Sequence, residues 1–172
     1  MKILVLNGSP HIDGATSDMV NAFSQGAREV GHEVVIINVA FKNVKGCMAC
    51  EYCRNKEKGV CVQKDDMQEI YPEILTSDMV VFASPIYYFT LSAQLQAVIH
   101  RTYSIDIPKK VKKVALIMSS GSKYVYGPAI TQYHQSIVEY WGVENAGIFT
   151  ANGRQNKSAK KRKELYRFGK SL

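Results

Sequence analysis

A loop of glycines and hydroxyl side chains near the N-terminus has the composition of a phosphate-binding site. Gly8 and Gly14 permit close approach of the backbone to a ligand, and Ser9, Thr16 and Ser17 supply hydroxyl groups. The loop ends where a helix is predicted to begin, and the free N–H groups and positive dipole end of a helix favour a phosphate. Because no Lys follows Gly14, the loop is not an ATP-type P-loop. The alternative is a helix that Thr16 or Ser17 merely caps, with no ligand.

Two more segments with functional groups follow predicted strands. One is Ser84-Pro85-Ile86-Tyr87-Tyr88-Phe89 and the other is Ser119-Ser120-Gly121-Ser122. In open α/β sheets, ligands bind beyond the carboxyl ends of the strands. The aromatic side chains of the first segment can stack on a flat ring, and the second segment can hydrogen-bond its polar edge. The alternative is that the Tyr-Tyr-Phe cluster belongs to the core or to an interface.

All four cysteines lie within fifteen residues, in the pattern C-x2-C-x2-C-x7-C. Clustered cysteines in a chain without a disulfide framework favour metal or redox chemistry. Two-residue spacing can bring three thiolates together on one turn, as iron–sulfur ligation requires, although the fourth spacing is wider than in bacterial ferredoxins. Zinc usually takes two separated C-x2-C pairs. The four residues are Cys47, Cys50, Cys53 and Cys61. They are candidate ligands of an iron–sulfur cluster or of zinc, or else they are unmetallated thiols with a structural or redox role.

Apolar runs alternate with segments of helical period along the whole chain. Continuous apolar runs favour strands buried on both faces, as in a parallel sheet. The runs at 3–6, 34–39, 79–83, 114–118 and 146–150 predict five strands, and the stripes at 19–30, 66–77, 91–99, 130–141 and 165–172 predict helices. This alternation predicts a doubly wound α/β protein with right-handed crossovers. We expect a flavodoxin-like three-layer sandwich whose five-stranded parallel sheet has the order 2-1-3-4-5, forming one domain over residues 1–172.

Composition is that of an ordinary globular protein. The chain has 172 residues, of which 46% are hydrophobic and 22% charged, so it can bury a core. Lys and Arg exceed Asp and Glu by 22 − 15 = 7, mostly at residues 109–113 and 157–170. This excess can steer anionic ligands such as dinucleotides, but no nucleic-acid-binding module is recognisable. With no signal peptide or membrane-spanning run in the pattern, we expect a cytoplasmic protein that binds neither membrane nor nucleic acid.

The segment Asn7-Gly8-Ser9-Pro10 through Thr16 resembles the phosphate loop of the NADPH-dependent FMN reductase family, a flavodoxin-like group. The likeness continues at Asp65-Asp66-Met67, Ser84 to Tyr88 and Ser119-Ser120-Gly121, and so covers nearly the whole chain. The resemblance implies that the FMN phosphate is held, mostly through backbone amides and hydroxyls, by Ser9, Gly14, Ala15, Thr16 and Ser17.

Two loop positions depart from the family pattern. His11 stands where an Arg is common, and Ala15 where an Asn is common. His11 can still reach the phosphate, with a charge that depends on pH. The resemblance further implies that the ribityl chain and ring are lined by Pro85, Ile86, Tyr87, Tyr88 and Phe89, and we expect the ring edge to meet Ser119, Ser120 and Gly121. Tyr124 and Tyr126 are weaker candidates as ring neighbours.

The cysteine segment resembles that of the iron–sulfur flavoproteins, a branch of the same superfamily. In that branch, the four cysteines carry a [4Fe-4S] cluster that exchanges electrons with FMN. Other flavin reductases have a similar cysteine-rich loop without needing a cluster. Three alternatives therefore remain open for Cys47, Cys50, Cys53 and Cys61: an iron–sulfur cluster, a zinc ion, or free thiols.

The function that the residues and the resemblance predict is an FMN-dependent NAD(P)H oxidoreductase. Electrons would pass from a reduced nicotinamide through FMN to a flavin, a quinone or another acceptor. We expect no catalytic side chain, because the protein's part is to position and tune the cofactor. The alternative is an iron–sulfur flavoprotein or flavodoxin-type carrier that relays electrons between protein partners. The resemblance also implies a homodimer or homotetramer, since this family commonly completes its flavin pocket across an interface.

Overall fold

The computed structural model describes all 172 residues, and its central feature is a parallel sheet. Five parallel strands run in the order β2-β1-β3-β5-β6, and a short β4 pairs antiparallel with β3. Set apart from β4, the five strands have the predicted flavodoxin-like order. The strands are β1 (Lys2–Asn7), β2 (Glu33–Asn38), β3 (Met79–Tyr87), β4 (Thr90–Leu91), β5 (Lys113–Ser120) and β6 (Glu144–Asn152).

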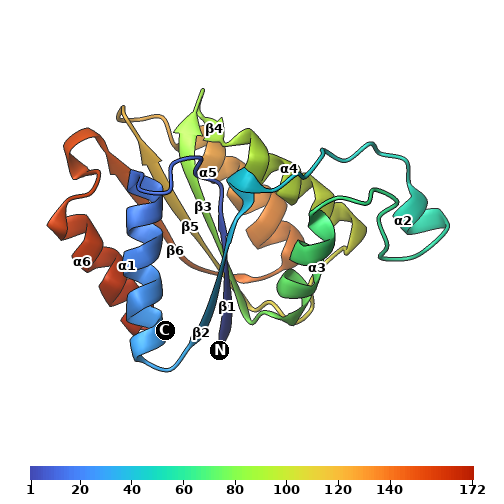
Figure 1. Ribbon diagram of the computed structural model, residues 1–172, viewed down its shortest axis with the longest axis horizontal. Helices are drawn as coiled ribbons and strands as arrows, with labels where there is room; N and C mark the ends of the chain where they lie inside the picture. The colour runs from blue at the N-terminus through green and yellow to red at the C-terminus, as the bar shows by residue number, and fades with distance from the viewer.

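Helices cover both faces of the sheet (Figure 1). One face carries α1 and α6, and the other carries α3, α4 and α5. The α-helices are α1 (Ala15–Glu29), α2 (Tyr52–Asn55), α3 (Met67–Thr76), α4 (Ala93–Arg101), α5 (Gly127–Tyr133) and α6 (Ala159–Lys170). Short 3-10 helices lie at Val39–Phe41, Thr102–Ser104 and Gly153–Gln155, and a turn of π-helix, His134–Glu139, follows α5. No helix is long and apolar enough to cross a membrane.

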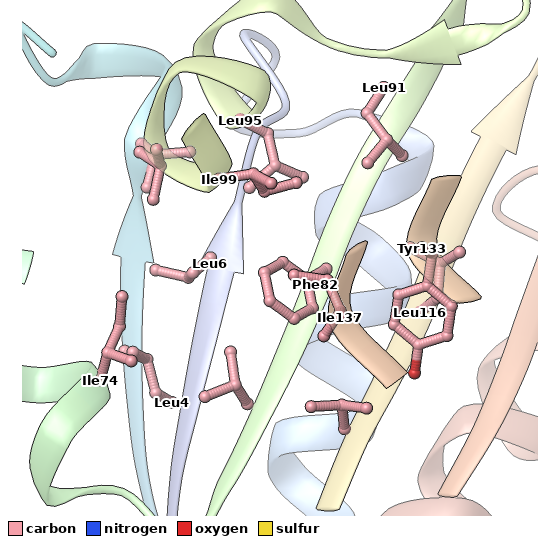
Figure 2. Packing of buried hydrophobic residues seen from close by; sticks show 14 of the residues in the cluster. Leu4, Leu6, Ile74, Phe82, Leu91, Leu95, Ile99, Leu116, Tyr133 and Ile137 are labelled. Carbon is pink, nitrogen blue, oxygen red and sulfur yellow. The ribbon is translucent and has the colours of Figure 1, made fainter. Parts of the chain in front are cut away.

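Burial follows the strand order. The three central strands β1, β3 and β5 are buried almost throughout, while the edge strands β2 and β6 are largely half-exposed. On the face toward α3, α4 and α5, Phe82 and Leu116 pack with Ile137 and the ring of Tyr133 (Figure 2). Unbroken apolar sequence in the central strands is therefore explained by helices on both sides.

The apolar stripe at 91–99 is not wholly helical, as its periodicity had predicted. Leu91 belongs to β4, which pairs with β3 through Ile86, and α4 begins only at Ala93. The side chain of Leu91 is still buried, at 3% exposure, in the same core as Leu95. The helical spacing therefore predicted the burial of Leu91 correctly but assigned the residue to the wrong element. Strand pairing with β3 determines the local structure there, not the helical period.

The segment that carries the cysteines extends away from the sheet (Figure 1). It runs from residue 42 to residue 66 and contains only the four-residue helix α2. Backbone contacts join its two ends, where Asp66 donates to the carbonyl of Asn43 at 3.2 Å. The cysteines thus lie on a long excursion that is closed at its base.

Helices α1 and α6 approach each other closely at two glycines. A Cβ added at Gly26 would lie 2.1 Å from the carbonyl oxygen of Tyr166, and one at Gly169 would lie 2.2 Å from that of Phe23. Backbone atoms cannot move aside as flexible side chains do. The absence of side chains at these positions therefore fixes the distance between the helices.

We expect Gly26→Ala to lower the free energy of unfolding by about 1–3 kcal/mol or more, because the added methyl group forces α6 away from α1. Gly127→Ala is the matched control, since a Cβ there has nothing within 4 Å, and it should stay within about 0.5 kcal/mol of the parent. Denaturant unfolding measures both. Equal stability of the two variants would contradict this close helix crossing.

Candidate functional site

The carboxyl ends of three neighbouring strands bring the predicted site segments together. In the sheet register, Asn7 of β1 lies beside Ala83 of β3, and Pro85 of β3 lies beside Ser119 of β5. The hydroxyl groups of Thr16 and Ser119 are 2.7 Å apart and hydrogen-bonded. The glycine-rich loop, the aromatic segment and the serine segment therefore meet at one edge, as expected for a ligand site of a doubly wound sheet.

The loop is held in place by its own polar side chains. Asn7, 3% exposed, donates through Nδ2 to Ser17 Oγ at 3.2 Å and to Asn38 Oδ1 at 3.0 Å. Its Oδ1 accepts the backbone N–H of Ser9 at 3.1 Å. Hydroxyl groups of Ser9 and Ser17 both donate to the carbonyl of His11, at 3.1 and 2.9 Å. These two hydroxyls thus shape the loop, and Asn7, which the sequence did not single out as a site residue, organises it.

The N-terminus of α1 has free donors. Gly14 occupies the N-cap position and no side chain caps the helix, so capping by Thr16 or Ser17 is not the structure adopted. The first helical backbone bond runs from Asp18 N–H to the carbonyl of Gly14, and the N–H groups of Ala15, Thr16 and Ser17 have no partner. Three adjacent unpaired N–H groups at a helix N-terminus favour the binding of an anion, so this end of α1 is the candidate phosphate position.

At two positions of this loop, only glycine fits because neighbouring atoms leave no room for a side chain. A Cβ at Gly8 would lie 2.5 Å from Ser92 Oγ, and one at Gly14 would lie 2.9 Å from the Cβ of His11. Neither requirement involves a ligand, since both contacts are within the protein. The two glycines let the loop fold tightly enough to direct its backbone N–H groups outward.

The aromatic segment leaves the sheet in a strained conformation. Tyr88 and Phe89 have φ of 46° and 67°, in the left-handed region that residues with a side chain rarely adopt. Tyr88 is 97% exposed, yet Pro85 and Ile86 just before it are buried. Tyr87 of β3 pairs with Thr90 of β4, so Tyr88 and Phe89 are the two central residues of a tight hairpin turn, which requires positive φ at both positions. The turn holds the two aromatic side chains out toward solvent at the end of β3.

A cleft of about 320 Å³ lies between the aromatic and serine segments. Its size is at the lower end of the range for small-molecule sites. It is lined by Ile86, Tyr88, Phe89, Ser120, Gly121, Ser122 and Val125. Five of the residues predicted to contact a flavin therefore line one cleft.

Tyr126 has a structural role. Its hydroxyl is 2.7 Å from Ser120 Oγ and donates to the carbonyl of Ala151 at 2.7 Å. Burial raises the pKa of Tyr126. Tyr124 is the opposite case, 94% exposed with φ of 62°. Tyr126 thus braces Ser120 from behind, and Tyr124 extends into solvent.

A second, more open groove extends from the glycine-rich loop toward the cysteines. It measures about 770 Å³, and the residues along it include Pro10, Tyr87, Tyr88, His100 and Gly46. Gly46 immediately precedes Cys47 in the sequence. The groove therefore joins the loop and the aromatic segment to the base of the cysteine segment.

All four cysteines line one small cavity, of about 20 Å³, which has room for about one water molecule. Cys47 and Cys50 are exposed, Cys61 is half-buried and Cys53 is buried. Burial raises the pKa of the Cys53 thiol. No three His, Cys, Asp or Glu side chains converge closely enough to hold a single metal ion. The structure thus gathers the predicted ligands around a common space without bringing them to one point.

A buried ion pair supports the cysteine segment from below. Arg101 Nη1 donates to Asp65 Oδ2 at 2.6 Å, and the two side chains are 1% and 4% exposed. Asp65 also accepts the backbone N–H groups of Lys45 and Met67. Burial acts to raise the pKa of Asp65, but these hydrogen bonds outweigh it and leave the pKa below its ordinary value. The sequence did not single out this pair as ionic.

The outer end of the cysteine segment is attached by polar contacts. The guanidinium of Arg54 lies 4.4 Å from the ring centroid of Tyr103 and donates to the backbone carbonyl of that residue at 2.9 Å. Arg54 also pairs with Asp106 at 3.3 Å, and Glu51 accepts a hydrogen bond from the hydroxyl of Tyr103. The segment is therefore fixed at its base and at its tip, with the cysteine cavity between.

Fold and site together define a flavodoxin-like α/β protein whose candidate anion-binding loop lies at the switch point of its sheet. The family that matches the sequence is described as NADPH-dependent FMN reductase, and the match covers residues 1–143. The chain belongs to the NADPH-dependent FMN reductase family.

Individual relatives agree with this assignment. An iron–sulfur flavoprotein of Archaeoglobus fulgidus is 30% identical over 158 residues, covering 89% of this chain and 69% of that protein. One from Methanocaldococcus jannaschii is 34% identical over 105 residues, covering 61% of this chain and 52% of that protein. The chain spans about half the length of most iron–sulfur flavoproteins that it matches.

A solved structure shows the same fold. The NAD(P)H:quinone oxidoreductase from Methanothermobacter marburgensis superimposes with a TM-score of 0.76 at 18% identity, covering 100% of this chain and 96% of that one. At this identity, the likeness establishes the architecture alone.

We expect Asp65→Asn to lower the free energy of unfolding by about 3–5 kcal/mol at neutral pH, because it leaves the buried Arg101 without a counter-charge. Glu69→Gln is the control: it breaks the ion pair with Lys42, in which the Glu69 side chain is 65% exposed, and should cost less than about 1 kcal/mol. Denaturant titrations of both variants measure the difference.

The same pair predicts a pH dependence. The folded-state pKa of Asp65 is lowered, so its contribution is complete above the unfolded value of about 4 and is lost as pH falls through the folded value. Stability of the parent should therefore fall more steeply than that of Asp65→Asn between about pH 5 and pH 3. If the free energies of unfolding of the parent and of Asp65→Asn changed in parallel with pH, Asp65 would not be the ionised partner of Arg101.

Proposed function

We propose that the protein is an FMN-dependent NAD(P)H oxidoreductase that passes electrons from a reduced nicotinamide to a flavin, quinone or other acceptor. The observation that carries the proposal is the set of three unpaired N–H groups at the start of α1, beside a cleft walled by strained, exposed aromatics. The family described as NADPH-dependent FMN reductase supports the cofactor and the donor.

The residues present fit FMN. A phosphate would accept from the backbone N–H groups of Ala15, Thr16 and Ser17, in a loop that Ser9 and Gly14 shape and His11 borders. The ring and ribityl chain would lie against Pro85, Ile86, Tyr87, Tyr88 and Phe89, with the ring edge at Ser119, Ser120 and Gly121. FMN bound there would supply hydride and electron-transfer chemistry between a reduced nicotinamide and an acceptor.

The protein's own contribution is positioning. The cleft between the aromatic and serine segments contains no carboxylate, histidine or lysine, so no side chain there can exchange a proton near neutral pH. Backbone donors of the helix would fix one end of the ligand, and Ile86 and Phe89 would give the other end an apolar surface to lie against. We therefore assign no catalytic side chain.

A second candidate is an iron–sulfur flavoprotein that relays electrons between protein partners. It is favoured by the placement of four thiols around one cavity. In a [4Fe-4S] cluster the four thiolates surround a polyatomic core, so a common space, rather than convergence on one ion, is the arrangement required. The donor set fits this cluster, which would supply single-electron transfer, and the small cavity requires the segment to open around it.

A homodimer or homotetramer is part of the proposal. Tyr88 and Tyr124 are almost fully exposed near the cleft, and large apolar surface rimmed by polar groups favours an interface. Static light scattering of the flavin-loaded protein, with and without Tyr88→Ser, tests whether this surface joins the subunits.

The experiment that tests the function is an anaerobic absorbance spectrum of the freshly purified protein, with iron and acid-labile sulfide assayed on the same sample. Loss of the flavin bands on addition of NADPH or NADH supports the oxidoreductase. Reduction only by a ferredoxin or a similar protein donor, together with about four iron atoms per chain, supports the carrier. A protein that neither contains nor binds FMN would refute both.

We expect Ala15→Pro to weaken FMN binding about tenfold to a hundredfold while leaving riboflavin binding unchanged. Proline is accepted at the first position of a helix and removes only the N–H, and hydrogen bonds to charged groups contribute about 1.5–3 kcal/mol. Ser24→Ala, a buried hydroxyl elsewhere on α1, is the control. Fluorescence titration of both flavins measures the affinities, and an equal loss for riboflavin would place the phosphate elsewhere.

A further inference from the structure

Arg101 has hydrogen-bonding capacity that its protein partners do not use. Arg101 is the last residue of α4 and is only 1% exposed. Nη1 makes all of its side-chain hydrogen bonds, to Asp65 Oδ2 at 2.6 Å and to the carbonyl of Lys45 at 3.0 Å. Nε and Nη2 are buried and have no partner. Buried guanidinium donors without acceptors are costly and rare.

Nearby protein oxygens are already engaged. Asp65 Oδ2 accepts from Lys45 N–H as well as from Arg101, and its Oδ1 accepts from Met67 N–H. The carboxylate of Glu51 accepts from the hydroxyl of Tyr103. The ion pair with Asp65 thus neutralises the charge of Arg101 without satisfying the remaining donors.

The side chain of Arg101 lines the same cavity as the four cysteines. It is the only cationic residue among those that line it. Four thiols line this cavity beside the guanidinium, and anionic sulfur attracts hydrogen bonds and positive charge. Unused buried donors and a thiol-lined cavity thus occur at the same place.

We propose that Arg101 is the positioning residue of the cysteine site, donating through Nε and Nη2 to anionic sulfur of an iron–sulfur cluster held by Cys47, Cys50, Cys53 and Cys61. The inference rests on the second candidate function. Hydrogen bonds to sulfur and nearby positive charge stabilise the reduced, more negative form of a cluster and raise its reduction potential. The Asp65 pair holds the guanidinium in place, so the donors are present before the cluster forms.

The test compares three variants of the full chain after anaerobic reconstitution with ferrous iron and sulfide. Arg101→Lys keeps the charge, and Arg101→Gln removes it. Because Arg101→Gln leaves Asp65 buried alone, the double variant Arg101→Gln with Asp65→Asn removes both charges together. Arg54→Gln is the matched control, an arginine beside Cys53 whose guanidinium lies on Tyr103 and not along the cavity. FMN content reports that each variant has folded.

Two readouts decide the outcome. We expect Arg101→Gln and the double variant to lose iron to a chelator about tenfold faster or more and to shift the cluster potential to lower values. Arg101→Lys should restore most of the potential. Arg54→Gln releases the tip of the segment, so it can speed iron loss but should keep the potential of the parent. A merely structural role, in which Arg101 braces the segment and a water accepts from its free donors, changes iron retention but not the potential, and that result would overturn the proposal.

The remaining outcome separates this proposal from the one on which it rests. A parent protein that binds FMN but takes up no iron would refute the cluster and the role of Arg101 together, while leaving the oxidoreductase intact. Uptake of iron with the same potential in every variant would refute the role of Arg101 alone.

Discussion

The candidate flavin site depends on one buried side chain at the carboxyl end of β1. Asn7 holds Ser17 at the start of α1, Asn38 at the end of β2 and the backbone of Ser9 in the loop. Through these contacts, a strand end fixes the angle at which the loop leaves the sheet. The hydroxyl groups of Ser9 and Ser17 are engaged by the carbonyl of His11 inside the loop, and the first N–H groups of α1 stay without a partner. Without this internal network, the same hydroxyls would compete to cap the helix, and the anion site would be lost.

Much of this edge could be predicted because its signals are local. Apolar runs predicted the parallel strands and their order, and the glycines and the predicted helix start of residues 7–17 indicated a phosphate loop. What the sequence could not show was how the hydroxyls are used: Ser9 and Ser17 shape the loop, and Thr16 bonds to Ser119 more than a hundred positions away. Leu91 was assigned to the wrong element, since its burial is set by pairing with β3 and not by helical period.

The ion pair at the cysteine site was not predictable from the sequence for a related reason. Asp65 and Arg101 are 36 positions apart, and isolated charged residues are exposed in most proteins. Only the fold shows that α4 ends beneath the cysteine segment and that both side chains are buried there. The four cysteines, by contrast, lie close together in the sequence, so their gathering around one cavity needed only a short loop. Local spacing thus indicated the candidate ligands, and only the tertiary structure shows the buried charge that lines the same cavity.

Helix α4 physically connects the two candidate sites. At its N-terminal end, Ser92 and Leu95 press against Gly8 of the phosphate loop, so closely that a Cβ there would lie 2.5 and 2.9 Å from them. At its C-terminal end, Arg101 holds the base of the cysteine segment through Asp65 and Lys45. The helix has nine residues and is therefore about 13 Å long, and Leu95, Val98 and Ile99 anchor it in the main core. A rigid helix of this length fixes the separation of the two sites.

The two sites differ in how firmly their own residues are held. The glycine-rich loop is tied to neighbouring strands through the buried side chains of Asn7 and Thr16. The cysteine segment is held mainly by polar contacts, at its base through Asp65 and Asp66 and at its tip through Glu51 and Arg54. Segments with few buried apolar contacts open at low free energy. The part between the two attachments can therefore open to admit a polyatomic group while Arg101 stays fixed below it. Opening of the segment would thus change the cysteine cavity without disturbing α4, Gly8 or the glycine-rich loop.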